Sequence, residues 1–493
     1  MIEKIKNLAS DTAMYGFFTI LGRFLTFLLT PLYTNYLSVT ELDNIIYIYS
    51  IIAFLNIVYS FGMESAFFRF WDKDKLSRSK HVFTHTYVAI AVVSLTLSAI
   101  FFFNAKSFGP AISDLNNAYL LIQIGAFIPL LDALVLIPYA LLRMTRRSKR
   151  FALTKFGIIL LAVFLNFLFV VYLEMGAVGV LLAQLIASAT GVIIFLPMIN
   201  FYLVFGFDPH LFKNLLKFGL PTLPANLAAM VLQVADRIFL KHFEVTSHAL
   251  ATYGVNRRLG IPMMILVTVF EYAWKPFYLS NFNEEGAKKL YARVLTYFSI
   301  VAITIFFLTS FYMEFVVRAP FIGGNFINPA YWQGMDIIPI ILIAYYFNGL
   351  FTNFAAGFLI TKNTKYIPLA VGIGAGVNIL LNMLLIPEIG YYGSAWAALA
   401  SYFTSAAVLF ILLRKVYPIN YEWSRILKLL GLTGIIYFFA TYFTAELDLL
   451  WTFIIKTSSL LLFIIVLRIF GFFTPTELKG IQDLIRRGTK KGK

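Results

Sequence analysis

Apolar runs of about 20 residues recur along this chain of 493 residues, separated by short charged segments. A helix needs roughly 20 apolar residues to cross the hydrocarbon core of a bilayer. The pattern therefore predicts an all-α polytopic membrane protein with about 14 transmembrane helices. The expected spans are 12–37, 45–70, 81–104, 118–142, 155–173, 178–205, 214–240, 249–275, 292–316, 335–360, 366–386, 393–415, 426–445 and 450–470.

Composition narrows the class of protein further. The chain is 60% hydrophobic and 13% charged, with a mean hydropathy of +0.81, whereas about 25% of residues are charged in a globular domain. Cysteine is absent and the five histidines have no metal-ligand spacing, so thiol chemistry is excluded and no metal site is expected. No GxxxxGK[ST] motif occurs, and hence ATP hydrolysis is not expected. The sequence predicts neither an enzyme nor a bound cofactor.

The positive charges have a strongly biased distribution. Of the 40 Lys and Arg residues, 31 lie in or beside the loops on one side, three beside the loops on the other side, and six within spans. Positive residues stay on the cytoplasmic side of a membrane protein, so both termini are expected in the cytoplasm. The net charge of +16 then reflects topology, and no nucleic-acid partner is expected.

A weak internal repeat appears at a shift slightly above 200 residues. Gly16 and Gly219 correspond, and Gly176-x-x-Gly179 matches Gly390-x-x-Gly393. Two pseudo-symmetric six-helix lobes of the same orientation are typical of alternating-access transporters. We expect an N-lobe at 1–205, a C-lobe at 206–416, a pair of added helices at 417–470, and a cytoplasmic amphipathic tail at 471–493, for which a frayed tail is the alternative.

Ten ionisable residues lie within or at the ends of the spans. Such residues are costly in a membrane and usually face the interior of the bundle. All except Asp132 fall in the first, second, seventh and eighth spans, and cations exceed acids by two, which predicts a positive cavity suited to a diphosphate or an acidic sugar. The ten are Arg23, Glu64, Arg69, Asp132, Asp236, Arg237, Arg257, Arg258, Glu271 and Lys275.

Four arginines are the candidate substrate-binding residues. Arg23 lies in the middle of a span with no acid near it in sequence. Arg257 and Arg258 are neighbours and point about 100° apart on a helix, so one is expected to face the cavity and the other to pair with Asp236. Arg69 is close to a span end and has snorkelling to the interface as its alternative.

Candidates for ion coupling, to H⁺ or Na⁺, are the buried acids Glu64, Asp132 and Asp236. Asn378 and Asn382 share one helix face, and with Asp236 they offer three oxygens to a hard cation. Hydrogen bonding between helices is the alternative role for the two asparagines.

Glu271 and Lys275 are four residues apart on one span, with the acid first. This spacing and order favour a local ion pair on a helix. We therefore expect them to form a structural pair rather than to bind substrate.

Four stretches resemble the multidrug/oligosaccharidyl-lipid/polysaccharide (MOP) exporter superfamily, and within it most closely the Wzx-type polysaccharide flippases. They are KFGLPTLPANLAAMVLQVADRIFL (217–240), YGVNRRLG (253–260), FEYAWKPF (270–277) and VNILLNMLLIPEIGYYGSAWA (377–397). About fourteen spans are usual in the polysaccharide and MurJ-like lipid II branches, whereas multidrug members usually have twelve.

This resemblance implies a flippase that carries undecaprenyl-diphosphate-linked oligosaccharide to the outer leaflet of the bacterial cytoplasmic membrane, with glycosyltransferases or a polymerase as pathway partners. It also implies that the last two spans form a groove for the prenyl tail, against which a plain stabilising pair is the alternative. In lipid II flippases a sodium site occupies places similar to those of Asp236, Asn378 and Asn382. A MATE-like drug antiporter and a lipid II flippase are the alternative functions.

Overall fold

The computed structural model describes residues 2–72, 74–112, 115, 117–243, 248–470 and 472, with side chains excluded for 2–15, 110 and 111. The predicted amphipathic tail, 471–493, lies outside these residues apart from Phe472. The chain forms two compact units. The first contains residues 1–280 and 315–417, and the second contains 281–314 and 418–493.

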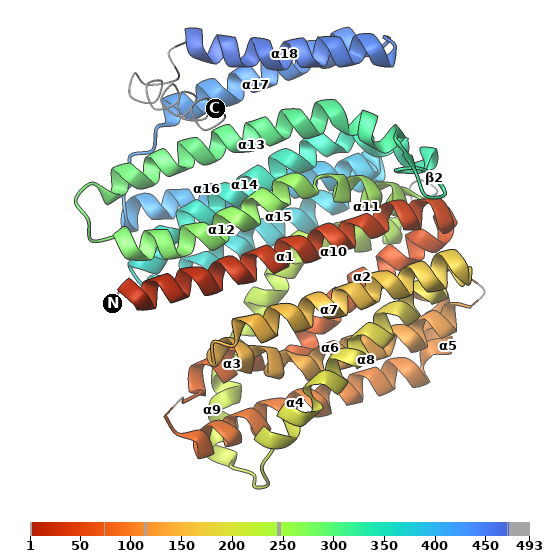
Figure 1. Cartoon of the computed structure of the whole chain (residues 1–493), viewed down its shortest axis with the longest axis vertical. Helices are drawn as coiled ribbons and strands as arrows, with labels where there is room; N and C mark the ends of the chain where they lie inside the picture. Colours follow the sequence, from red (N-terminus) through yellow and green to blue (C-terminus); the bar gives the residue numbers. More distant parts are fainter. Residues whose placement is uncertain are drawn as a thin grey trace, which may run out of the picture. The chain divides into compact units, whose positions relative to one another are not determined.

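The first unit is a bundle of long helices (Figure 1). Its one sheet among the described residues is the hairpin of β1 and β2, in which Pro320 pairs with Asn325. Its elements are α1 (Ile2–Tyr36), α2 (Val39–Ser60), α3 (Met63–Phe70), α4 (Leu76–Phe103), α5 (Ala105–Ile112), α6 (Ala118–Met144), α7 (Ser148–Asn166), the π-helical η1 (Phe167–Tyr172), α8 (Gly176–Tyr202), α9 (Pro209–Gly219), the 3₁₀ turn η2 (Leu220–Thr222), α10 (Leu223–Phe243), α11 (Ala249–Leu259), α12 (Ile261–Asn281), β1 (Pro320–Phe321), β2 (Gly324–Asn325), the 3₁₀ segment η3 (Pro329–Ile337), α14 (Ile338–Ile360), α15 (Tyr366–Ile389) and α16 (Tyr391–Val416).

Thirteen helical segments in the described part of the chain are long and apolar enough to cross a membrane. They correspond to all the predicted spans except the eighth, at 249–275. That span is helical as well, as α11 and α12, but it carries Arg257, Arg258, Glu271 and Lys275. The prediction of an all-α, multi-pass membrane fold is confirmed, and the one span with low hydropathy is the one with the most intramembrane charge.

Local sequence signals fix several helix ends. Ser38 and Glu41 form a capping box at the start of α2, in which each side chain accepts a hydrogen bond from the other residue's backbone. This arrangement satisfies two backbone donors that a helix start leaves unpaired. Asp208 caps α9 by accepting from the backbone N–H groups of Leu211 and His210, and the first of these bonds is the main reason that the pKa of Asp208 lies below its usual value.

Two helix breaks face each other. One break follows Gly219, where α9 gives way to a 3₁₀ turn before α10. A second break, between α2 and α3, falls at Gly62, whose φ is +78°. A Cβ on Gly62 would lie 2.0 Å from the carbonyl oxygen of Gly219. Glycine is therefore required at position 62 both by its backbone conformation and by the close approach of the backbone at Gly219. Pro31, by contrast, is accommodated inside continuous α1.

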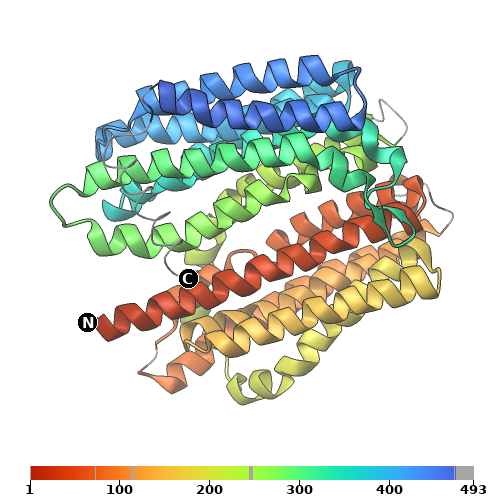
Figure 2. The same ribbon diagram turned by 45° about the horizontal axis from the view of Figure 1, so that its top comes forward.

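Helices of the two predicted lobes meet within this unit. α2 of the predicted N-lobe contacts α10 and α11 of the predicted C-lobe. Within the N-lobe, α1 runs alongside α7 (Figure 2). Asp43 of α2 accepts a hydrogen bond from the backbone N–H of Ala251, in the first turn of α11 (2.8 Å). The matched glycines of the repeat also agree in conformation, because Gly176 and Gly390 begin α8 and α16 with φ of +55° and +59°.

The second unit consists of α13 (Ala287–Arg318), α17 (Trp423–Thr444) and α18 (Leu449–Ile469), apart from the last residues of α13. Aromatic side chains join these helices, and the ring centroids of Phe307 and Phe463 are 4.8 Å apart. Lys456 of α18 is buried and forms an ion pair with Glu314 of α13 (3.5 Å). The last two spans thus contact α13, which the sequence assigns to the C-lobe; the lobe boundaries stay predictions.

Candidate functional site

Two cavities in the first unit share five lining residues and form the candidate site. The first, of about 430 Å³, lies against α1 and α7 and is called the α7 half. The second, of about 600 Å³, lies against α10, α12, α14 and α16 and is called the α16 half. The shared residues are Arg23, Arg237, Arg257, Met264 and Tyr345.

The α7 half is rich in cations. Its described lining includes five of them and no acid, and the rest is largely apolar. Positive charges enclosed by low-dielectric walls focus the electrostatic field on an anion. The cations are Arg23, Lys155, Arg237, Arg257 and Arg258.

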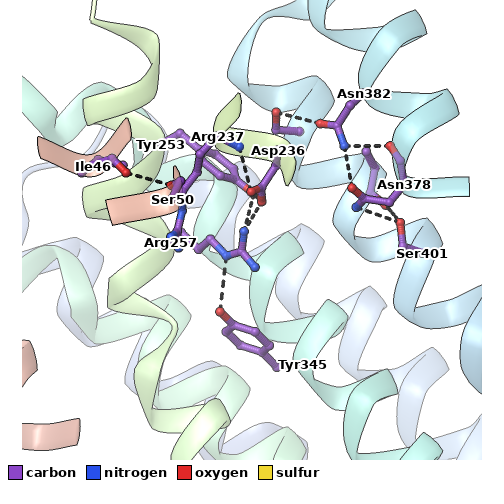
Figure 3. Close-up of polar contacts among 12 residues, drawn as sticks. Ile46, Ser50, Asp236, Arg237, Tyr253, Arg257, Tyr345, Asn378, Asn382 and Ser401 are labelled. Carbon is purple, nitrogen blue, oxygen red and sulfur yellow. Dashed lines mark hydrogen bonds and ion pairs between the residues drawn. The ribbon is translucent and has the colours of Figure 1, made fainter. Parts of the chain in front are cut away.

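Arg257 is the one cavity cation with an acid partner among the described residues. It forms an ion pair with Asp236, and the two side chains are 5% and 2% exposed. Tyr253 donates a hydrogen bond to the same carboxylate (2.5 Å), and Tyr345 accepts one from Arg257 Nε (3.5 Å), as Figure 3 shows. A buried charge is tolerated when it is paired and hydrogen-bonded. The sequence prediction that one of the two neighbouring arginines pairs with Asp236 therefore agrees with the structure.

The other arginines of the cavity make no ion pair within the described part of the chain. Arg23 donates a hydrogen bond to the Thr268 hydroxyl of α12. Arg258 lines only the α7 half of the two, with no acid in the described lining there. Nε of Arg237 is buried and has no hydrogen-bond acceptor among the residues that the structure describes. These guanidinium groups retain donors for a ligand.

The α16 half has a different chemistry. Beyond the shared residues its described lining holds one charged residue, Glu271, together with amides and hydroxyls. The side chains of Glu271 and Lys275 are both exposed, and the described residues show no ion pair between them. The structure thus places Glu271 on the cavity wall rather than in the expected local pair.

Two other predicted residues lie away from both cavities. Glu64 pairs with Arg143 of α6, and their side chains are 31% and 39% exposed. Glu64, an ion-coupling candidate from the sequence, therefore has a basic partner on a neighbouring helix. Arg69 is exposed in the last turn of α3 and lines neither half in the described structure, a position that suits the snorkelling alternative.

The remaining ion-coupling candidates each have polar partners. Asp132 accepts a hydrogen bond from Ser188 of α8 (2.7 Å). Asn378 donates to Ser401 (3.1 Å), and Asn382 accepts from Ser394 (3.1 Å), both on α16. The asparagines therefore link α15 to α16, the alternative role expected from the sequence, and Figure 3 shows no bond from this group to Asp236. The described residues contain no group of three acids or histidines that would hold a metal.

Sequence reasoning missed part of the site. Lys155, at the start of the fifth predicted span, lines the α7 half from α7 and was not among the candidates from the sequence. Tyr345 lines both halves and contacts Arg257, but one tyrosine among the chain's 28 carries no signal in sequence. Arg237 was identifiable only as an intramembrane charge.

Comparison with known proteins agrees with this architecture. Residues 36–326, more than half of the chain, match the family described as "polysaccharide biosynthesis protein". An uncharacterized membrane protein of Methanocaldococcus jannaschii is 24% identical over 244 residues, which cover 47% of this chain and 45% of that protein. The match thus spans less than half the length of this relative.

Solved structures share the fold. The lipid II flippase MurJ in an inward closed conformation has a TM-score of 0.73 and 19% identity, covering 93% of this chain and 98% of that chain. An inward-facing multidrug resistance MATE transporter of the MOP superfamily has a TM-score of 0.59 and 13% identity, covering 80% and 94%. The predicted resemblance is confirmed: the chain belongs to the polysaccharide biosynthesis protein family and has the fold of the MOP superfamily.

Proposed function

We propose that this protein is a flippase that moves an undecaprenyl-diphosphate-linked oligosaccharide from the cytoplasmic to the outer leaflet for surface polysaccharide biosynthesis. The observation that carries the proposal is the α7 half, where the side chains of Arg23, Lys155, Arg237 and Arg258 make no ion pair among the described residues. Arginine forks match the oxygens of a diphosphate. Phe18, Phe27 and other apolar residues of the same half suit the adjoining prenyl chain.

Family and fold support a transport function rather than an enzymatic one. The family description concerns polysaccharide biosynthesis, and solved proteins of this fold include a lipid II flippase and a multidrug transporter. A cavity with excess positive charge disfavours a cationic drug as cargo. Lipid II carries the same prenyl-diphosphate chemistry and is therefore the substrate that a test must separate from an oligosaccharide.

Transport is driven, in this proposal, by an H⁺ or Na⁺ gradient. One charge moving through the membrane potential supplies about 2.3 kcal/mol per 100 mV. If a carboxylate binds its protein partner in one conformational state and H⁺ or Na⁺ in the other, cation binding shifts the equilibrium between the states. The energy of the gradient is thereby coupled to the conformational change. Asp236, Glu64 and Asp132 are the candidates, each with a partner in the present state: Arg257, Arg143 and Ser188.

We expect the purified protein in proteoliposomes to move undecaprenyl-diphosphate oligosaccharide across the bilayer faster when a proton or sodium gradient is imposed. Lipid II and a cationic drug, tested in parallel, should move slowly. Translocation is measured by accessibility of the glycan to an impermeant reagent. Equal rates in protein-free liposomes would reject the flippase function, and preference for lipid II or for the drug would reassign the substrate.

The proposed topology places both termini in the cytoplasm, with any partner glycosyltransferases on that side. The Cys-free background makes a labelling test simple, with exposed Asn104 on the outer side and exposed Lys149 on the inner side. In intact cells, a membrane-impermeant maleimide should label Asn104→Cys and not Lys149→Cys, and permeabilisation should expose the second site. The reverse pattern in intact cells would invert the topology.

A further inference from the structure

The two halves of the cavity differ in the polar side chains that line them. The cations that belong to one half alone, Lys155 and Arg258, are both in the α7 half. The α16 half adds no cation of its own among the described residues. Its own polar lining consists of Gln233, Thr268, Glu271, Asn348, Thr352 and Ser405, with Tyr402.

Glu271 occupies a defined place in this second half. It lies on α12, three residues after Thr268, and residues at this spacing share a helix face. Thr268 is the hydroxyl that accepts the hydrogen bond of Arg23. The carboxylate of Glu271 therefore lies one helical turn beyond the arginine contact, on the wall of the α16 half, with an exposed side chain that makes no ion pair or hydrogen bond within the described structure.

We propose that the α16 half holds the sugars nearest the diphosphate, and that Glu271 selects neutral or amino sugars there and rejects acidic ones. This inference rests on the proposed flippase function. Sugar hydroxyls, amides and amines donate hydrogen bonds that a carboxylate accepts. The amide and hydroxyl side chains of the α16 half add further hydrogen-bond donors and acceptors for a sugar ring.

Beyond the cations that it shares with the α7 half, the α16 half offers an acidic sugar no compensating charge among the described residues. Of the shared cations, Arg257 is already neutralised by Asp236. In the proposed complex Arg23 and Arg237, with the cations of the α7 half, bind the diphosphate itself. A uronic carboxylate would then lie beside Glu271, and like charges brought together across a binding interface select against a ligand. The positive cavity thus recognises the diphosphate, while its acidic wall restricts the glycan.

The test uses two lipids with the same undecaprenyl diphosphate and a different first sugar, one an N-acetylhexosamine and the other a hexuronic acid. Binding to the purified protein is measured for both lipids. The wild type should prefer the neutral lipid by at least about tenfold. Glu271→Gln should reduce this ratio by about tenfold, chiefly through tighter binding of the acidic lipid. Glu271→Asp, which retains the charge, and Lys275→Gln, one turn away, should leave the ratio unchanged.

The outcomes separate the inference from the function on which it rests. A thermal unfolding temperature of Glu271→Gln equal to that of the wild type shows that the variant is folded. If both lipids bind and the ratio stays the same in this variant, the role of Glu271 is overturned and the flippase function stands. Loss of gradient-driven transport with an unchanged ratio would also overturn it, in favour of ion coupling. If the wild type binds neither lipid, the proposed function itself fails.

Discussion

Arg258→Ala is expected to reduce flipping of the lipid-linked oligosaccharide to background while the protein remains at normal abundance. Arg258 lines the α7 half and has no ion pair among the described residues, so removing it leaves no partner charge buried alone. A hydrogen bond to a charged group contributes about 1.5–3 kcal/mol, which corresponds to roughly 10- to 100-fold weaker substrate binding. Arg23→Ala should act similarly, because Arg23 lies where the two halves meet.

Binding and proteoliposome flipping are measured on the same preparations. Arg258→Lys should restore only part of the activity, since lysine cannot form the two parallel hydrogen bonds of a guanidinium. Lys149→Ala, which removes an exposed cation of α7, is the matched control and should behave as the wild type. Arg69→Ala distinguishes the two interpretations of that residue: wild-type activity fits the exposed position in the structure, and loss of binding fits the substrate role expected from the sequence. Full activity of both Arg258→Ala and Arg23→Ala would refute diphosphate recognition at this cavity.

The fold followed from the sequence because hydrophobic length is a strong local signal. Runs of apolar residues dictate where helices cross a bilayer, and the one span with reduced hydropathy was still recognisable from its neighbours. The clustering of charge in four spans likewise predicted a polar cavity, since intramembrane charges seek one another or water. Arg23, Arg257 and Arg258 all line it.

Side-chain partners were less predictable because they depend on helix rotation. Glu64 pairs with Arg143, which lies 79 residues later in the sequence on another helix. In the sequence, Arg143 had the features of an ordinary loop cation. The spacing of Glu271 and Lys275 permits a local pair, but a cavity on the same side of α12 offers the carboxylate a different environment. The position of a residue along a span predicts its depth in the membrane well. It does not predict the direction in which the side chain points around the helix axis, so the depth of each charge was predictable and its partner often was not.

The ion pair of Asp236 and Arg257 is expected to contribute both to the stability of the fold and to the coupling of transport to an ion gradient. Both side chains are nearly inaccessible, and Tyr253 and Tyr345 complete their hydrogen bonds. Removing one member of such a pair leaves an uncompensated buried charge, which typically costs about 3–5 kcal/mol. Replacing both by apolar residues of similar volume is often neutral. The pair therefore allows a structural contribution to be separated from a functional one.

Asp236→Ala and Arg257→Ala are each expected to lower the thermal unfolding temperature by several degrees, whereas Asp236→Leu combined with Arg257→Met should unfold close to the wild type. The double variant is then a folded protein without the candidate coupling carboxylate. If Asp236 takes up the coupling cation by exchanging Arg257 for it, this variant should still bind the lipid-linked oligosaccharide through Arg23 and Arg258, but an imposed proton or sodium gradient should no longer accelerate flipping. Wild-type unfolding temperatures in both single variants would contradict the structural role of the pair. A gradient response retained by the double variant would exclude Asp236 and leave Glu64 and Asp132 as the candidates, because the energy of the gradient must enter through a group whose affinity for the cation differs between the two states.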